Sequence, residues 1–167
     1  MVIEHLSALY QLSADTGMTF VYCSYKESRT TTTYIRMALK QLCQAMQSLP
    51  LELQDVYNKH YYNDSHPKYD ELRVAFLAII QQFGRIFFVL DALDECSLDQ
   101  RKDLCDFILS LANTTSTNTS QGIVKLFITS RKESDIEQAF LRKSIPIIKI
   151  EVTSMLTTNT GVMYVYF

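Results

Sequence analysis

The chain has 167 residues, 47% of them hydrophobic and 20% charged, which is the composition of a single globular domain rather than a disordered chain. Its formal net charge of -2 gives no electrostatic reason to expect binding to nucleic acid or to an anionic membrane. No stretch approaches the roughly 18 apolar residues of a membrane helix, and residues 1–6 lack the basic region of a secretory signal. We therefore expect a cytoplasmic domain.

The first half of the chain predicts one strand followed by helices. Aromatic and β-branched residues that follow a glycine favour a strand, and apolar residues at helical spacing favour the helices after it. These elements are expected over residues 19–25 (strand), 31–47, 51–61 and 72–83 (helices). The last of the helices ends just before Gly84 and leads the chain into a second strand.

The most informative segment is this second strand, an apolar run at residues 86–90 that continues directly into Asp91, Asp94 and Glu95. A short continuous apolar run is typical of a strand buried on both faces of a parallel sheet, where ligands gather at the carboxyl ends of the strands. Carboxylates at that position are expected to meet a cation, such as the Mg²⁺ of a nucleotide site. The alternative is that they only cap the helix that follows.

The second half repeats the alternation of strand and helix, which favours parallel pairing with right-handed crossovers. A helix is expected to begin near Ser97 and to end at Asn113, before a loop rich in serine, threonine and asparagine. The later elements are expected over residues 124–129 (strand), 135–141 (helix) and 145–152 (strand). Residues 161–167 are aromatic and β-branched, and one interpretation inserts them into the sheet as an additional strand.

Two stretches carry a family resemblance. Residues 86–96 (IFFVLDALDEC) and 125–137 (KLFITSRKESDIE) resemble the NACHT-type P-loop NTPase domain, and more narrowly the nephrocystin 3-like amino-terminal domain. That domain occurs in fungal STAND proteins with ankyrin or WD repeats. The resemblance implies an α/β fold, a three-layer P-loop NTPase-like parallel sheet with flanking helices, over residues 1–150. It leaves residues 151–167 as a divergent carboxyl-terminal tail.

The resemblance also implies a role for each of the three carboxylates. Asp91 matches the Walker B acid that holds Mg²⁺, usually through water. Asp94 and Glu95 match the catalytic acids that orient or activate the hydrolytic water. These roles suit phosphoryl transfer, which needs charge neutralisation and an aligned nucleophile more than covalent work by the protein.

A cationic group is implied on the neighbouring strand. Arg131 matches the sensor arginine that contacts the γ-phosphate of ATP, or of GTP in some members, and Thr129 and Ser130 would help to aim it. A guanidinium suits this role because it forms forked bonds to phosphate oxygens and keeps its charge. The residues alone leave a second interpretation open, in which Arg131 is a surface ion-pair partner of Glu133 or Asp135.

The phosphate-gripping motif of such proteins is the element that this sequence lacks. A P-loop has the pattern G-x-x-x-x-G-K-[ST], whereas none of the four glycines here is followed by lysine. We therefore expect a sheet without the family's first, central strand, and an open slot in its place. Two functions follow: a partial nucleotide-binding signalling module without independent hydrolysis, or a non-catalytic interaction remnant of a truncated gene product. Nucleotide, protein partners or self-association are the expected partners.

Overall fold

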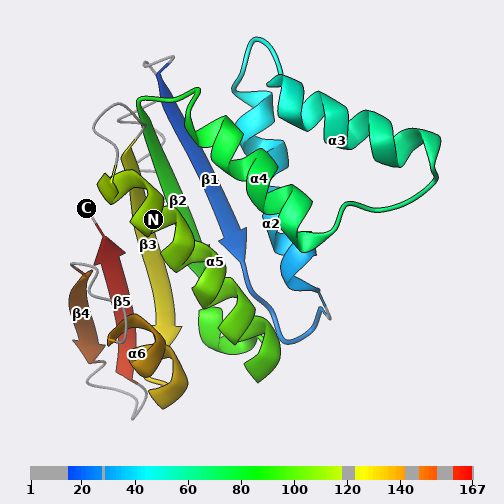
Figure 1. The fold of residues 1–167 in the computed structure, drawn as a ribbon. Coiled ribbons are helices and arrows are strands. Elements are labelled where there is room, and N and C mark those ends of the chain that lie inside the picture. Colours follow the sequence, from blue (N-terminus) through cyan, green and yellow to red (C-terminus); the bar gives the residue numbers. More distant parts are fainter. Residues whose placement is uncertain (1–14, 28, 118–122, 142–146, 154–159, 167) are drawn as a thin grey trace.

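The computed structural model describes residues 15–27, 29–117, 123–141, 147–153 and 160–166. Their strands form one five-stranded sheet in the order β1-β2-β3-β5-β4 (Figure 1). The strands are β1 (Thr16–Tyr22), β2 (Arg85–Asp91), β3 (Ile123–Arg131), β4 (Ile147–Thr153) and β5 (Thr160–Tyr166). The helices are α2 (Thr31–Gln44), α3 (Leu51–Tyr62), α4 (Tyr69–Ile80), α5 (Leu98–Thr117) and α6 (Ser134–Leu141). The predicted α/β class and the alternation of elements are confirmed.

The sheet is mixed, whereas the sequence predicts a parallel one. Strands β1, β2 and β3 pair in parallel, but β5 lies between β3 and β4 and runs antiparallel to both. The interpretation that residues near 161–167 insert as an additional strand is therefore confirmed. A short connection of six residues, 154–159, separates β4 from β5 in the chain, and antiparallel neighbours need no crossover helix.

The expected open slot in the middle of the sheet is absent from the part of the chain that the structure describes. Strand β2 pairs directly with β3, with residues 85–90 opposite residues 123–128. Both strands therefore have a hydrogen-bonding neighbour on each side, β1 beside β2 and β5 beside β3. The backbone groups that the missing-strand argument would leave unpaired are satisfied by this direct contact.

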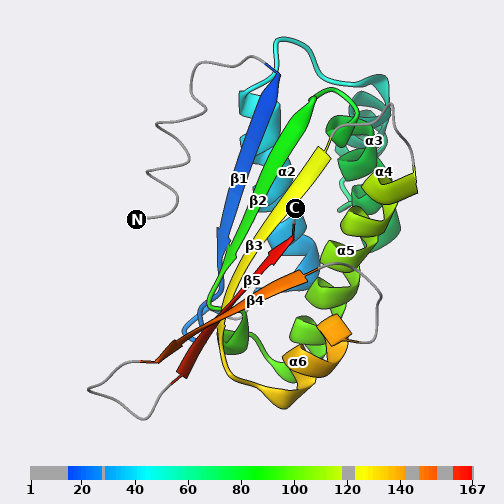
Figure 2. The same ribbon diagram turned by 90° about the vertical axis from the view of Figure 1, so that its left-hand side faces the viewer.

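The described helices all lie along one face of the sheet (Figure 2). Helix α2 packs on β1 and against α4, while α5 packs on β3 and against α6. The second helical layer that a three-layer fold implies is not among the described elements. None of the described helices has the length and the apolar character to cross a membrane.

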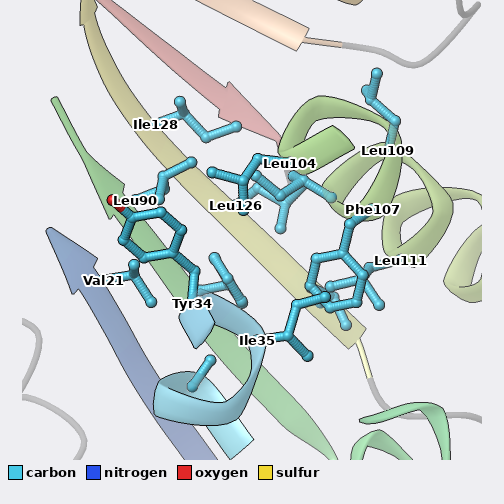
Figure 3. Packing of buried hydrophobic residues seen from close by; sticks show 14 of the residues in the cluster. Val21, Tyr34, Ile35, Leu90, Leu104, Phe107, Leu109, Leu111, Leu126 and Ile128 are labelled. Atoms are coloured by element: carbon cyan, nitrogen blue, oxygen red, sulfur yellow. The ribbon is translucent and has the colours of Figure 1, made fainter. Parts of the chain in front are cut away.

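The main core lies between the sheet and these helices. Side chains of β1, β2, β3 and β5 point into it, and Figure 3 shows side chains of α2 and α5 meeting those of β2 and β3. Phe107 on α5 forms the centre of an aromatic cluster, with its ring centroid 5.3 Å from Phe76 and 6.4 Å from Phe88. Residues 86–90 of β2 are all buried, which confirms the prediction of a strand covered on both faces.

Two helices differ from their predictions. Helix α5 continues to Thr117, through the first part of the segment expected to be a loop beyond Asn113. Helix α3 contributes no fully buried residue, and it is held to α4 by an ion pair from Lys59 to Glu71 and a hydrogen-bond contact between His60 and Glu71. The bond from Lys59, followed by hydrogen bonds from the Lys68 N–H and from His60, lowers the pKa of Glu71 to about 2. Polar contacts at the surface therefore stabilise the packing of α3 against α4, to which buried apolar side chains of α3 do not contribute.

Candidate active site

The acidic segment after β2 begins with a sharp change of backbone direction. Asp91 is the last residue of the strand, and Ala92 adopts the left-handed conformation with φ 56° and ψ 49°. A residue with a Cβ is disfavoured there by roughly 1–2 kcal/mol, so the surrounding structure must hold it in place. A single turn of 3-10 helix over Leu93–Glu95 follows and presents the two remaining acids near the strand end.

Asp91 is fixed by its neighbour on β3. The Thr129 hydroxyl donates a hydrogen bond to the Asp91 carboxylate, and the same hydroxyl oxygen accepts one from the Ala92 N–H at 3.0 Å. One side chain therefore orients the Asp91 carboxylate and also ties the left-handed turn to the next strand. The Asp91 carbonyl in turn accepts a bond from the Cys23 N–H at 3.0 Å.

Asp94 and Arg131 form a two-bond pair. The Arg131 N–H donates to one carboxylate oxygen of Asp94 at 2.8 Å, and its Nε donates to the other at 2.6 Å. The Asp94 side chain is only 4% exposed, whereas that of Arg131 is 57% exposed. Among the described residues the side-chain bond of Arg131 uses its Nε, which leaves both terminal Nη groups for another anion.

The pairing with Arg131 has a larger effect on the pKa of the Asp94 carboxyl than burial has. Burial raises the pKa of Asp94, but the hydrogen bonds and charge of Arg131 lower it more, so that the net pKa lies below its ordinary value. The reciprocal hydrogen bond from Asp94 raises the pKa of Arg131. Asp94 is therefore a carboxylate whose two oxygens are already occupied, and it holds Arg131 at the end of β3.

The third acid has a looser environment. The Glu95 carboxylate accepts one bond from the Tyr25 N–H at 3.3 Å, which links the acidic segment to the chain just after β1. The Glu95 side chain is half-buried. Of Asp94 and Glu95, it is Glu95 that retains a carboxylate oxygen without a partner among the described residues.

The side chain of Arg101 is hydrogen-bonded to the backbone of the acidic segment, a contact that the sequence did not predict. Its Nη2 donates to the carbonyl oxygens of Asp94 at 2.7 Å and Cys96 at 3.3 Å, and its Nη1 donates to both carboxylate oxygens of Asp135. Arg101 is buried. The available signal was its helical spacing, because Arg101 shares a face of α5 with the buried residues Leu104 and Cys105.

These residues surround one cavity at the carboxyl ends of β2 and β3, with a volume of about 390 Å³. It is lined by Ala92, Asp94, Glu95, Thr129, Ser130, Arg131, Val162 and Met163. Five of the six predicted site residues therefore line the same cavity, and the sixth, Asp91, is bonded to Thr129 at its edge. Val162 and Met163 were not predicted. They come from β5, whose residues 161–163 lie opposite residues 129–131.

Ser130 was expected to help to aim the Arg131 guanidinium, but its hydroxyl makes a different contact. Its side chain is buried, and its hydroxyl donates to the Arg131 carbonyl at 2.6 Å. It therefore acts on the backbone of the arginine rather than on its guanidinium. Within the described ranges, no three or more His, Cys, Asp or Glu side chains are grouped so as to hold a metal ion by themselves.

Asp94→Asn should test the pair with Arg131. We expect a loss of about 1 kcal/mol in the free energy of unfolding at pH 7, because the substitution removes the negative charge and one of the two acceptor oxygens, while the 57% exposure of Arg131 screens the pair. A carboxylate with a lowered pKa stabilises the fold above its unfolded value, near 3.8, and this contribution is lost as the pH falls through the lower folded value. Denaturant melts should show the difference from wild type shrinking below pH 4, and a constant difference would contradict the pairing.

Comparison with known proteins gives one family. The family model described as Nephrocystin 3, N-terminal matches residues 1–131 of this chain. The match therefore includes β1, β2, β3 and the whole acidic segment, and it ends at Arg131. A search of curated proteins gives no match.

Proposed function

The chain belongs to the nephrocystin 3 N-terminal family, and we propose that it is part of a nucleotide-binding signalling module of the NACHT and STAND class. The observation that carries the proposal is the cavity at the ends of β2 and β3, where acids, hydroxyls and one arginine converge. Convergent polar groups in a concave site at the carboxyl ends of parallel strands favour ligand binding. ATP or GTP, together with Mg²⁺, is the ligand that these groups suit.

Asp91 is the residue proposed to hold Mg²⁺. This ion is usually bound through one or two carboxylates, with water and substrate phosphates completing its octahedron, so a three-ligand protein cage is unnecessary. The Asp91 carboxylate is half-buried and oriented by the Thr129 hydroxyl, and this donor set fits a water-mediated ion. When bound, the ion would neutralise charge on the phosphates.

The geometry suggests distinct roles for Asp94 and Glu95. Both oxygens of Asp94 are bonded to Arg131, so we assign it the positioning of that arginine rather than contact with water. Arg131 keeps its Nη groups for a phosphate, which agrees with a sensor role. Glu95, with one N–H bond at 3.3 Å, is then the better candidate for orienting a water molecule.

We do not expect this chain to hydrolyse nucleotide by itself. The sequence contains no G-x-x-x-x-G-K-[ST] segment, so it lacks the amides that cradle phosphates and the lysine that reaches the β and γ oxygens. Among the described residues that line the cavity, the side-chain cation available to a phosphate is Arg131, whose charge Asp94 already balances. Asp91 would then hold Mg²⁺, and the ion would supply the remaining charge neutralisation for the phosphates.

The test is a paired measurement of nucleotide binding and phosphate release by the full chain. We expect weak binding of a fluorescent ATP analogue that requires Mg²⁺ and is reduced by Asp91→Asn, together with no phosphate release above the blank. The control variant is Glu133→Gln, which lies outside the cavity and should bind like wild type. Phosphate release that is lost in Glu95→Gln but kept in Glu133→Gln would contradict the absence of hydrolysis.

The second candidate function is a non-catalytic interaction or scaffold module. It is favoured by the mutual neutralisation of Asp94 and Arg131 and by the side chain of Met163 in the cavity wall, which together make a stable site without a ligand. The same titration separates the two functions. A scaffold should show no Mg²⁺-dependent binding and no effect of Asp91→Asn, whereas a nucleotide module should show both.

A further inference from the structure

Strand β4 is the outermost strand of the described sheet on the side opposite β1 (Figure 1). It pairs with β5 on one side, and among the described elements no strand lies on its other side. The opposite edge of the sheet is treated differently, because the Gln41 amide bonds to both the N–H and the carbonyl of Phe20 on β1. An edge strand with free backbone groups is a ready template for pairing with another chain.

The side chains of β4 alternate between charge and exposed hydrophobic surface. Lys149 forms ion pairs with Glu137 of α6 and with Glu151, which places the two charged residues of the strand on the helix side of the sheet. Ile148 and Ile150 therefore lie on the other side, where their exposed fractions are 53% and 41%. Two exposed isoleucines on an unpaired edge favour a partner of similar character.

We propose that β4 pairs antiparallel with β4 of a second copy of this chain, around a two-fold axis at Ile150. Such an axis, perpendicular to the sheet, keeps the helices of both copies on one side. Opposite residues must then belong to the same face, which allows only registers centred on a residue. Because β4 spans Ile147–Thr153, the register centred on Ile150 is the one that pairs all its residues.

Charge selects the same register. When Ile150 lies opposite its own copy, Lys149 lies opposite Glu151 of the second copy, and this happens twice by symmetry. Registers centred on Lys149 or on Glu151 would place like charges opposite each other, which is destabilising. The central register also brings the exposed Ile150 side chains together and joins the two sheets into one. This inference does not depend on nucleotide binding.

A cysteine introduced at the axis should report the register. In the proposed dimer the Cα atoms of two opposite residues lie about 4.5–5.5 Å apart, within the range that a disulfide spans. We expect Ile150→Cys, under mild oxidation of the full chain, to give a covalent dimer on a non-reducing gel. The matched control is Ile148→Cys on the same face of β4. In the proposed register the two copies of residue 148 are offset by four residues along the paired strands, so the yield of covalent dimer should be at least tenfold lower.

The wild-type chain provides the baseline for cross-linking through its native cysteines, of which Cys43 is partly exposed and Cys23, Cys96 and Cys105 are buried. Sedimentation analysis of the unmodified chain should show a reversible dimer, and Glu151→Lys should weaken it at least tenfold by placing lysines opposite lysines. Circular dichroism would establish that each variant is folded. A monomeric wild-type chain at 100 µM, on the order of the weaker specific interfaces, would overturn the proposal. Equal cross-linking at positions 148 and 150 would also overturn it.

Discussion

Val162→Asp is expected to abolish the cooperative thermal transition of the protein, or to lower its stability by about 4 kcal/mol or more. Val162 lies on β5, between Ser130 of β3 and Glu151 of β4, and its side chain is buried in the main core. Val162 also borders the cavity, but Arg131, the cation of the cavity lining, is already paired with Asp94, so a carboxylate there would have to be desolvated beside an ion pair that is already balanced or would have to take up a proton. Changes of this size are reserved for a few mechanisms, and a buried unpaired charge is one of them.

The large effect follows from the location of β5 inside the sheet. If residues 160–166 were a peripheral tail, a charge there would be tolerated, because surface substitutions usually change stability by less than about 0.5 kcal/mol. The neighbouring Tyr164 stacks on Phe140 of α6 with ring centroids 4.7 Å apart, so the strand also anchors that helix. Loss of β5 would therefore separate β4 from the rest of the sheet and would leave α6 with its contacts to α5.

Denaturant and thermal melts monitored by circular dichroism should measure the effect. The matched control is Ile123→Asp, which makes a similar apolar-to-acid change on a strand but at a half-exposed position at the start of β3. We expect the control to remain within about 1 kcal/mol of wild type. A Val162→Asp melt that resembles that of the control would mean that β5 is not part of the cooperative unit.

Arg101→Met should produce the second largest effect, a loss of about 2–4 kcal/mol in the free energy of unfolding. The substitution keeps much of the apolar stem but leaves the Asp94 and Cys96 carbonyls without their donor, and it leaves the Asp135 carboxylate unpaired. Asp135 is partly exposed and can be hydrated, which is why the expected loss is below that of a fully buried ion pair.

The same variant should disturb the candidate active site at a distance. Arg101 fixes the backbone of the acidic segment from inside the protein, whereas Arg131 is held by the Asp94 side chain on the cavity side. We therefore expect Arg101→Met also to weaken the Mg²⁺-dependent binding of the nucleotide analogue. Lys102→Met, an exposed neighbour on α5, is the control and should leave both stability and binding unchanged. Equal free energies of unfolding for the two variants would contradict the stabilisation of the acidic segment by Arg101.

Much of the site could be predicted because its signals are local. The apolar run before Asp91 is continuous, so it indicates a doubly buried strand without any knowledge of its neighbours. The pattern of residues 124–129 predicted strand β3, whereas the role of Arg131 was implied by the family resemblance. Since parallel strands bring their carboxyl ends to one edge of a sheet, residues separated by a long helix could be expected to converge.

The pairing partners could not be predicted, because they depend on distances between segments far apart in the chain. The family resemblance led us to expect a catalytic acid at Asp94, and only the structure shows that Arg131 is bonded to both of its carboxylate oxygens. Arg101 reads as one more charged residue on a helix. Its burial becomes evident only when α5 is placed against β3 and α6.

The sequence by itself determined the α/β class, the order of the elements and the acidic end of β2, because hydrophobic periodicity and turn residues act within a few positions. The tertiary structure alone decided that β2 lies directly beside β3 and that β5 enters the sheet antiparallel between β3 and β4. Strand patterns record which residues are buried but carry no record of the neighbouring strand or its direction. The order and direction of the strands depend on the relative stability of all possible strand pairings, which involve residues far apart in the chain.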